Sequence, residues 1–205
     1  MADSALDEQA KRDEGSWRGT IIDLVRTAAE VLALFLILSL LIGRFEIHQV
    51  SMEPNLLEGE RVIVSKLETL WPDWLVGKAE AAGNGRGSLL SFQRGQIVVL
   101  QRPDDRESDP LIKRVVGLPG ETVEIREGEV FVDGRKLAEP YTNGQPTTCS
   151  RFCGPLTLGA QQYFVMGDNR PHSLDSRAFG PVGAGDIIGR VVLRYGPLNK
   201  VALYW

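Results

Sequence analysis

Ser51 is the residue of this sequence whose setting first suggests covalent chemistry. It stands in HQVSMEPNLLEGE (48–60), where the proline at position 54 restricts Glu53 before it to an extended backbone. A serine hydroxyl becomes a nucleophile when a neighbouring group removes its proton. The G-x-S-x-G, S-x-x-K and HExxH patterns do not occur in the chain. The base must therefore be sought among the other residues.

The chain has 2 histidines, and one of them could complete a conventional triad. His48 is three residues from Ser51, and an extended segment would direct these two side chains apart. His172 lies in GDNRPHSLDSR (167–177), a loop-like segment with several polar partners. A triad of Ser51, His172 and an aspartate is compatible with the spacing.

A neutral lysine is the alternative base. Its pKa of about 10.4 must then fall by roughly 2–3 units, which burial in apolar surroundings can achieve. Lys113 lies inside the β-branched run PLIKRVVGLPG (110–120), where a lysine is unusual. Strand alternation directs Lys113 and Arg114 to opposite faces, so that one can be buried while the other stays in water. An ordinary lysine on a solvated strand face is the competing interpretation.

The elements that must position these residues are mostly strands. β-Branched and alternating segments predict strands at 61–67, 96–102, 112–118, 162–168 and 186–197. The segment ETVEIREGEVFVDGRKL (121–137) predicts a hairpin turning at Glu127-Gly128 and a second turn at Asp133-Gly134. Long helical periodicity is confined to the N-terminal part. We expect a mainly β fold attached to one N-terminal helix.

The run TAAEVLALFLILSLLIG (27–43) is apolar except for Glu30. Its 17 residues reach the lower limit of roughly 17–25 that a bilayer-spanning helix needs. A buried helix of a soluble protein is the alternative, but residues 31–42 are apolar on every face rather than along one stripe. We favour a single membrane anchor at 27–43, preceded by a polar and loose tail at 1–26 and followed by a catalytic domain at 44–205.

Composition argues against nucleic-acid binding and against a zinc site. A net charge of −4 lacks the basic character of a nucleic-acid-binding protein, so no nucleic-acid partner is expected. The 2 cysteines, Cys149 and Cys153, are too few for a zinc site, and they could either form one short bridge or remain as two thiols. The Gly-rich segment at 78–91 indicates a surface loop, and LWPDWL (70–75) indicates either core or membrane-interface residues.

Three segments resemble one known family. SMEPNLLEGE, IKRVVGLPGE and GDNRPHSLDSRAFGPV follow the apolar run in this order, as in the bacterial type I signal peptidases, or leader peptidases. The resemblance covers about residues 49–196, and three motifs in order are highly specific. It implies a β-rich catalytic domain outside the plasma membrane of a bacterium, with no metal and no organic cofactor.

The resemblance also implies roles for individual residues. The first segment places the nucleophile at Ser51, and the second places the general base at Lys113. The third places a hydroxyl beside the lysine amine at Ser173. It further places Asp175 and Arg177 as an ion pair that supports the site.

The substrates implied by the resemblance are signal peptides of exported preproteins, cut after small residues in an A-x-A pattern. Met52, Leu56 and Ile112 match positions that line the pockets for those small side chains. The lipid bilayer and a nearby protein-export translocon are the other expected partners. Ser51 lies eight residues after the apolar run ends, or at most about 28 Å of extended chain, which suits a cleavage site at the membrane surface.

The chain departs from the family pattern in three places. Asn55 and Glu60 stand where the first segment more often has Thr and Asp. Gln49 stands where some relatives have a serine that helps to bind the oxyanion. Its amide could donate instead, beside the backbone N–H of Ser51.

Two other readings differ in class from a Ser-Lys peptidase. One is a Ser-His-Asp hydrolase that uses His172, and the other is a catalytically inactive, anchored β-domain that binds peptides or envelope partners. Intact Ser51 and Lys113 argue against the inactive domain.

The arginines flanking the apolar run predict its orientation. Arg12, Arg18 and Arg26 precede the run, whereas only Arg44 lies in the 15 residues after it, so the N-terminus should stay in the cytoplasm. Protease added outside intact cells or spheroplasts should therefore digest residues 44–205, as followed by immunoblotting. Cleavage restricted to the N-terminal tail would reverse this orientation.

Overall fold

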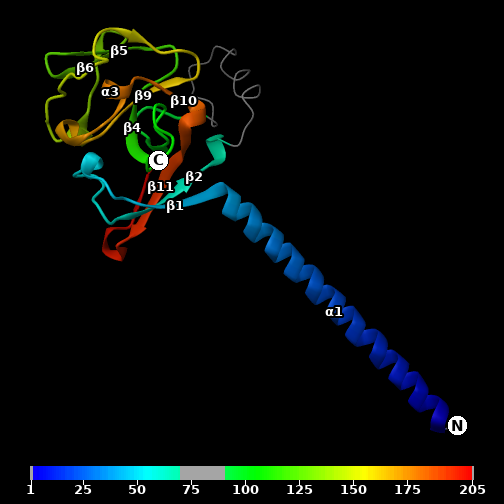
Figure 1. Cartoon of the computed structure of the whole chain (residues 1–205). Coiled ribbons are helices and arrows are strands. Elements are labelled where there is room, and N and C mark those ends of the chain that lie inside the picture. Colours follow the sequence, from blue (N-terminus) through cyan, green and yellow to red (C-terminus); the bar gives the residue numbers. More distant parts are fainter. Residues whose placement is uncertain (1, 70–90, 205) are drawn as a thin grey trace. The chain divides into compact units, whose positions relative to one another are not determined.

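The computed structural model describes residues 2–69 and 91–204, and for residues 2–19 and 68 it describes the backbone alone. The described chain divides after Leu41 into an N-terminal helical unit and a second unit that begins at Ile42 (Figure 1). The segment LWPDWL (70–75) and the predicted loop at 78–91, except for Ser91, lie outside the described residues.

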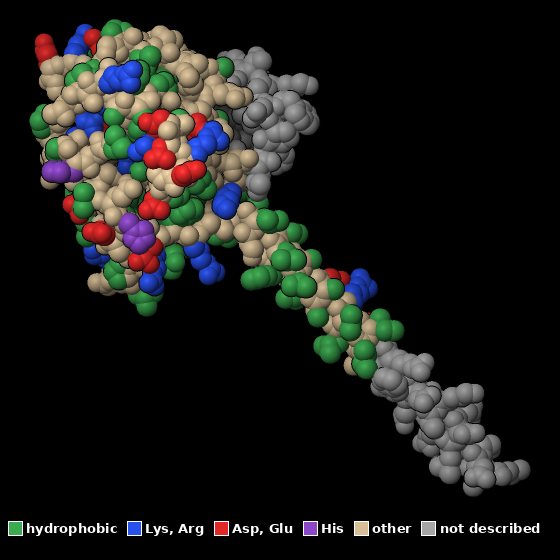
Figure 2. All heavy atoms as spheres, in the orientation of Figure 1, with side chains coloured by type: hydrophobic (Ala, Val, Ile, Leu, Met, Phe, Trp, Pro, Cys, Tyr) green, Lys and Arg blue, Asp and Glu red, His purple; other side chains and the backbone are tan. Residues whose placement is uncertain are grey.

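The N-terminal unit is one helix, α1 (Ala2–Leu41). Its segment Thr20–Leu41 has 22 residues, a mean hydropathy of 2.1 and no buried residue, so it is long and apolar enough to cross a membrane. At 1.5 Å per residue it measures about 33 Å. Hydrophobic side chains project along the length of this segment, interrupted by one basic and one acidic group (Figure 2).

The bounds of this helix differ from the sequence expectation at both ends. Residues 2–26, expected to be loose, continue the helix; they contain no proline and many good helix formers. Ile42 and Gly43, expected inside the anchor, belong instead to strand β1 (Ile42–Glu46). They leave the helix because β1 pairs in register with the strand at 61–65.

Polar side chains within the apolar segment find partners on the helix itself. Thr27 and Ser39 each donate a hydroxyl hydrogen bond to the backbone carbonyl four residues earlier, at 2.9 and 2.8 Å. The Glu30 carboxylate pairs with Arg26 one turn before it, at 3.0 Å. Hydrogen bonds of this kind reduce the cost of placing such groups in an apolar medium.

The second unit is built from two antiparallel sheets. The larger has 8 strands in the order β1-β2-β11-β3-β4-β9-β10, with β12 paired to β11, and the smaller has the order β7-β6-β5-β8. Beyond β1, the strands are β2 (Arg61–Ser65), β3 (Ile97–Leu100), β4 (Leu111–Gly117), β5 (Thr122–Arg126), β6 (Glu129–Val132), β7 (Arg135–Lys136), β8 (Leu156–Thr157), β9 (Gln162–Met166), β10 (Val182–Gly183), β11 (Ile187–Gly196) and β12 (Ala202–Leu203). The predicted mainly β class and its five principal strands are confirmed.

Both predicted turns are also present. Glu127 and Gly128 have φ of 53° and 81°, and Asp133 and Gly134 have φ of 49° and 74°. Two consecutive positive φ angles are typical of the tight turns that join antiparallel strands. They connect β5 to β6 and β6 to β7.

The segment after β1 is held against the large sheet by apolar burial. Met52 and Leu56 are fully buried in one core cluster with residues of β2, β3, β4 and β11. Removing side chains of this size from water contributes about 1.5–3 kcal/mol each. These two residues therefore fix the path of the chain on both sides of Pro54.

The two cysteines form a disulfide, which the sequence left undecided. Cys149 and Cys153 are joined with their Cα atoms 5.7 Å apart. Within the loop that they close, the N–H groups of Arg151 and Phe152 donate to the carbonyl oxygen of Arg177 at 2.8 and 2.9 Å. The disulfide loop is thereby attached to α3 (Ser176–Phe179).

Candidate active site

Ser51 lies in a short 3-10 helix, Val50–Met52, and is 4% exposed. Glu53 closes this turn with an extended backbone, as the following proline requires, and its N–H donates to the Val50 carbonyl at 3.2 Å. Because the next side chain, Met52, is fully buried, the turn cannot rotate freely about its own axis. The turn and the burial of Met52 in the core together orient the Ser51 hydroxyl.

Lys113 lies in β4 and is 1% exposed, so the solvated alternative for this lysine is wrong. Its Nζ donates to Ser51 Oγ at 2.7 Å and to the Ile112 carbonyl oxygen at 2.9 Å. Strand β3 flanks it, with Val98 as the paired residue. The structure therefore brings together the two residues that the sequence singled out, 62 positions apart in the chain.

Burial is the main reason why the amine of Lys113 is a candidate base. The pKa of Lys113 is lowered from 10.5 to about 8, and desolvation is the largest cause. The carboxylates of Asp175 and Asp168 oppose this shift because they stabilise the ammonium form, and the Arg177 guanidinium lowers the pKa further. The balance leaves an amine that loses its proton close to neutral pH.

Ser173 reaches the same region but does not bond to the amine. Its hydroxyl is buried and has no hydrogen-bond partner among the described residues, whereas the family resemblance places it beside Lys113. The hydroxyl lies close to Gly167: a Cβ on that glycine would collide with the Ser173 side chain and with the Ser51 carbonyl oxygen. Gly167 is thus needed for the close approach of these two segments.

The ion pair expected between Asp175 and Arg177 is present and buried. Nε and Nη2 of Arg177 each donate to the Asp175 carboxylate at 2.8 Å. The same carboxylate accepts the N–H of Gly167 at 3.0 Å. Arg177 also donates to the carbonyl oxygens of Thr148 and Arg170 at 3.0 and 2.7 Å. This pair therefore holds the loop 167–177 in one conformation.

A second buried pair was missed by the sequence reasoning. Arg114 binds Asp168 through Nε and Nη2, at 2.8 and 2.6 Å. The side chain of Arg114 is 12% exposed, so the expectation that one of residues 113 and 114 stays in water is wrong. Strand alternation does place Lys113 and Arg114 on opposite faces of β4. The face that carries Arg114 is nevertheless shielded from water, because Asp168 of the loop 167–177 binds the guanidinium there. The one sequence signal for this carboxylate was the Gly167-Asp168 pair that begins the third motif.

Two asparagines connect the Ser51 turn to this loop. Asn169 donates its backbone N–H to the Ser51 carbonyl at 3.0 Å and its side chain to the Val50 carbonyl at 3.1 Å. Asn55 donates its side chain to Asp168 at 2.8 Å and to the Tyr141 carbonyl at 2.8 Å. The departure from the family pattern at position 55 therefore preserves a hydrogen-bond donor.

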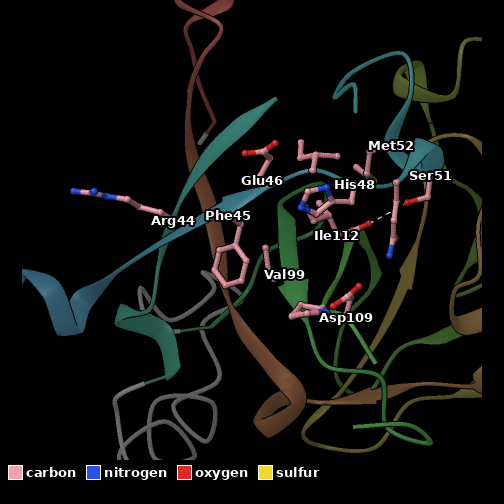
Figure 3. A pocket seen from close by; sticks show the side chains of 12 residues that line it. Arg44, Phe45, Glu46, His48, Ser51, Met52, Val99, Asp109 and Ile112 are labelled. Atoms are coloured by element: carbon pink, nitrogen blue, oxygen red, sulfur yellow. Dashed lines mark hydrogen bonds between the residues drawn. The ribbon is translucent and has the colours of Figure 1, made fainter. Parts of the chain in front are cut away.

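A cleft opens beside Ser51. It lies between residues 44–49 on one side and 109–112 on the other, with Met52 and Val99 also lining it. Figure 3 shows Ser51 at one end of the cleft, with Phe45 farther along it.

The residues expected to contact substrate have different positions in this cleft. Met52 and Ile112 line it, as does Gln49, the candidate second oxyanion donor. Leu56 is fully buried in the core cluster with Met52 and does not line the cleft. Leu56 therefore lies in the core cluster behind Met52, which lines the cleft.

Neither histidine bonds to Ser51. His172 is exposed, and its Nδ1 lies 3.1 Å from Oδ1 of Asn169. His48 is exposed at the cleft. In the described part of the chain, the Ser51 hydroxyl accepts a hydrogen bond from Lys113 Nζ and donates one to the Ile112 carbonyl oxygen. The geometry favours the lysine over the histidine as the base.

Comparisons with known proteins agree with the motifs. The family model described as "Signal peptidase, peptidase S26" matches residues 21–196. The "Probable signal peptidase I-2" of Synechocystis sp. is 31% identical over 99% of this chain and 86% of its own length. The "Signal peptidase I" of Bacillus amyloliquefaciens is 30% identical over 94% of this chain and 97% of its own length.

A crystal structure of a signal peptidase I from Enterococcus faecalis V583 is 32% identical, with a TM-score of 0.41, over 50% of this chain and 98% of that chain. The family model and the two relatives span the apolar helix and all three motif segments. The resemblance inferred from those motifs and the predicted enzyme class, a serine endopeptidase, are thereby confirmed. This chain belongs to the signal peptidase family, peptidase S26.

Proposed function

We propose that this protein is a membrane-anchored serine endopeptidase that removes signal peptides from exported preproteins, with Ser51 as nucleophile and Lys113 as general base. The observation that carries this proposal is the 2.7 Å contact between Lys113 Nζ and Ser51 Oγ at a buried position. A neutral amine there has a lone pair within reach of the hydroxyl proton. Family membership supports the substrate class.

Acylation follows from this geometry. The Ser51 hydroxyl transfers its proton to Lys113 Nζ while Oγ forms a bond to the scissile carbonyl carbon. The tetrahedral intermediate then collapses, the C–N bond breaks, and the Lys113 ammonium gives its proton to the leaving amine. An ester between the signal peptide and Ser51 remains, and Lys113 is neutral again.

Deacylation repeats the proton transfers with water. Lys113 accepts a proton from the attacking water and returns it to Ser51 Oγ as the ester bond breaks. In both halves the negative charge on the carbonyl oxygen needs donors. The backbone N–H of Ser51 is the first in this proposal, and the amide of Gln49, which lines the cleft, is the second.

The remaining site residues hold this pair in place. The Asp175–Arg177 pair fixes the loop that carries Ser173 and Gly167. Within the described part of the chain the buried Ser173 hydroxyl has no hydrogen-bond partner, so it is available to orient the lysine amine when substrate binds.

The cleft suits an extended peptide with small side chains next to the cleaved bond. Met52 and Ile112, which the family resemblance assigns to the pockets for small side chains, line it beside Ser51 with apolar side chains. Leu56 backs this wall. These features support cleavage after small residues in an A-x-A pattern.

The helix α1 supports a location at the plasma membrane of a bacterium. In this proposal Thr20–Leu41 spans the bilayer, the residues before it form a cytoplasmic tail, and the unit from Ile42 onward is the extracytoplasmic catalytic domain. Signal peptides emerging from a nearby export translocon would meet Ser51, which is only ten residues after Leu41.

Variants of the two candidate bases test the dyad. Lys113→Ala should abolish preprotein cleavage in detergent, and Lys113→Arg should do so too, because a guanidinium keeps its proton. His172→Ala should retain most of the activity, since His172 bonds to Asn169 and not to Ser51. Active Lys113→Ala together with inactive His172→Ala would replace the dyad with a histidine triad.

The pH profile tests the same proton transfer. The amine acts only when neutral, so the cleavage rate should rise with pH through the Lys113 pKa of about 8. At pH 7 about a tenth of the amine is then neutral. Rates are measured from pH 5 to pH 10 in wild type and His172→Ala. An acid limb near 6.5 that vanishes in His172→Ala would contradict a lysine base.

Gly167→Ala tests the close approach behind the nucleophile. The added Cβ would collide with the Ser173 side chain and the Ser51 carbonyl, so we expect kcat to fall by at least tenfold. Gly154→Ala is the matched control, because a Cβ at that position meets nothing within 4 Å and should leave the rate unchanged. Equal rates for the two variants would show that the contact is not needed.

A further inference from the structure

The peptide unit between Val50 and Ser51 carries the N–H group that the proposed mechanism assigns to the oxyanion. Its carbonyl oxygen accepts two hydrogen bonds, from the Glu53 N–H at 3.2 Å and from Nδ2 of Asn169 at 3.1 Å. These bonds use both lone pairs of the oxygen. The Glu53 bond closes the 3-10 helix, whereas the Asn169 bond comes from the loop 167–177, 119 positions away in the chain.

The direction of the Ser51 N–H follows from the direction of this carbonyl. The Val50–Ser51 peptide is trans, and in a planar trans peptide the C=O and N–H groups point in opposite directions. Because the carbonyl is directed at Asn169, the N–H is directed away from the loop 167–177. Within the described residues it donates to no protein acceptor, and Ser51 lines the cleft. The N–H is therefore a donor left for the substrate.

The backbone that carries Asn169 is held independently of the Ser51 turn. Its two neighbours in the chain are fixed by ion pairs, Asp168 with Arg114 and Arg170 with Glu139. Asn169 itself is 8% exposed. The loop therefore offers this amide from a fixed position.

The other polar groups of Asn169 are also engaged. Its Oδ1 lies 3.1 Å from Nδ1 of His172, which orients the side-chain amide so that Nδ2 faces Val50. Its backbone N–H donates to the Ser51 carbonyl at 3.0 Å. Asn169 thus binds the peptide unit before the nucleophile and the peptide unit after it.

We propose that Asn169 is a positioning residue for the oxyanion hole, because its side chain orients and polarises the peptide unit whose N–H binds the carbonyl oxygen of the scissile bond. This inference rests on the proposed function, in which the Ser51 N–H is the first oxyanion donor. A hydrogen bond to the carbonyl of a peptide strengthens its own N–H as a donor, since linked hydrogen bonds polarise one another. The bond also keeps the peptide plane from tilting, so the donor needs no reorganisation when charge develops.

The expected effect is on the chemical step. Removing an oxyanion donor outright lowers kcat by about 10²–10³-fold. Variants of Asn169 weaken the Ser51 N–H without removing it, so we expect kcat to fall by about tenfold. KM should stay nearly constant, because the oxyanion exists only after attack. Rates are compared on the plateau above the Lys113 pKa of about 8, where the amine is neutral in every variant.

Three variants isolate the side-chain donor. Asn169→Asp keeps the size of the side chain and an oxygen for His172, but it replaces the Nδ2 donor with an oxygen that repels the Val50 carbonyl. Asn169→Ala removes the amide. Asn55→Ala is the matched control: it removes the other asparagine that joins the Ser51 segment to this loop, and that residue donates to Asp168 and to the Tyr141 carbonyl instead.

Two peptide ligands separate oxyanion binding from ordinary binding. With a peptide that ends in an alanine aldehyde, Ser51 Oγ bonds to the aldehyde carbon, the hydroxyl proton passes to Lys113, and the carbonyl oxygen becomes the oxyanion of a hemiacetal. The corresponding peptide alcohol forms no such oxygen. In both Asn169 variants the aldehyde should bind about tenfold more weakly, in step with kcat, and the alcohol should bind as it does to wild type.

The Ser51 N–H can be observed directly by nuclear magnetic resonance. Val50-Ser51 and Val64-Ser65 are the two Val-Ser pairs of the sequence, so labelling with ¹³C-carbonyl valine and ¹⁵N-serine gives two amide signals. Ser51→Ala removes one signal and thereby assigns both. At saturating aldehyde the Ser51 proton should move downfield in wild type and in Asn55→Ala, and by less in the Asn169 variants. The Ser65 signal, from β2, is the internal reference.

Each result decides the inference. A lower kcat, weaker aldehyde binding and a smaller downfield shift in the Asn169 variants, with unchanged alcohol binding, would support it. An unchanged kcat, or a lower kcat with a wild-type Ser51 shift, would overturn it and leave Asn169 a structural role only. If Asn169→Ala does not fold, the isosteric Asn169→Asp decides alone. A wild type that forms no hemiacetal, or a Ser51→Ala variant that still cleaves, would overturn the proposed function as well.

Discussion

The contact between a buried lysine amine and a buried serine hydroxyl constrains the rest of this protein. Removing a charged amine from water is costly unless it is paired, and none of the described carboxylates is bound to Lys113. The amine responds by giving up its proton more readily, and the same neutral amine is what a serine nucleophile requires. Burial thus favours the neutral amine, and the fold must keep Lys113 away from water.

Strand β4 and the turn at Val50–Met52 together bury Lys113. Strand β4 places Lys113 between β3 and the loop 167–177, and the turn at Val50–Met52 closes the site with the Ser51 hydroxyl directed at the amine. Met52 holds that turn in the apolar core. Asn169 joins the turn to the loop through two hydrogen bonds, so Ser51 is held against the loop 167–177.

The buried charges of the loop 167–177 are paired, partly within the loop and partly with other segments. A buried carboxylate without partners would be strongly destabilising, yet Asp175 accepts from Arg177 and from the Gly167 N–H. Asp168 is bound on one side by Arg114 and on the other by Asn55. These pairs therefore give the loop next to Lys113 its structural support.

The sequence by itself determined the mainly β class, the turns at Glu127-Gly128 and Asp133-Gly134, and an apolar segment able to cross a membrane. It did so because alternation, turn chemistry and hydrophobicity are local properties of the chain. The three motifs added Ser51 and Lys113 as partners, although the strand pattern alone favoured a solvated Lys113 over a buried one.

Only the tertiary structure decided which groups surround that pair. The end of α1 at Leu41 depends on the pairing of β1 with β2, and the burial of Arg114 depends on a loop that begins more than fifty residues later. Leu56 lies behind the cleft wall rather than in it because the core cluster takes its side chain. Contacts between distant segments set desolvation and charge pairing, and periodicity along one strand carries no information about what covers its other face.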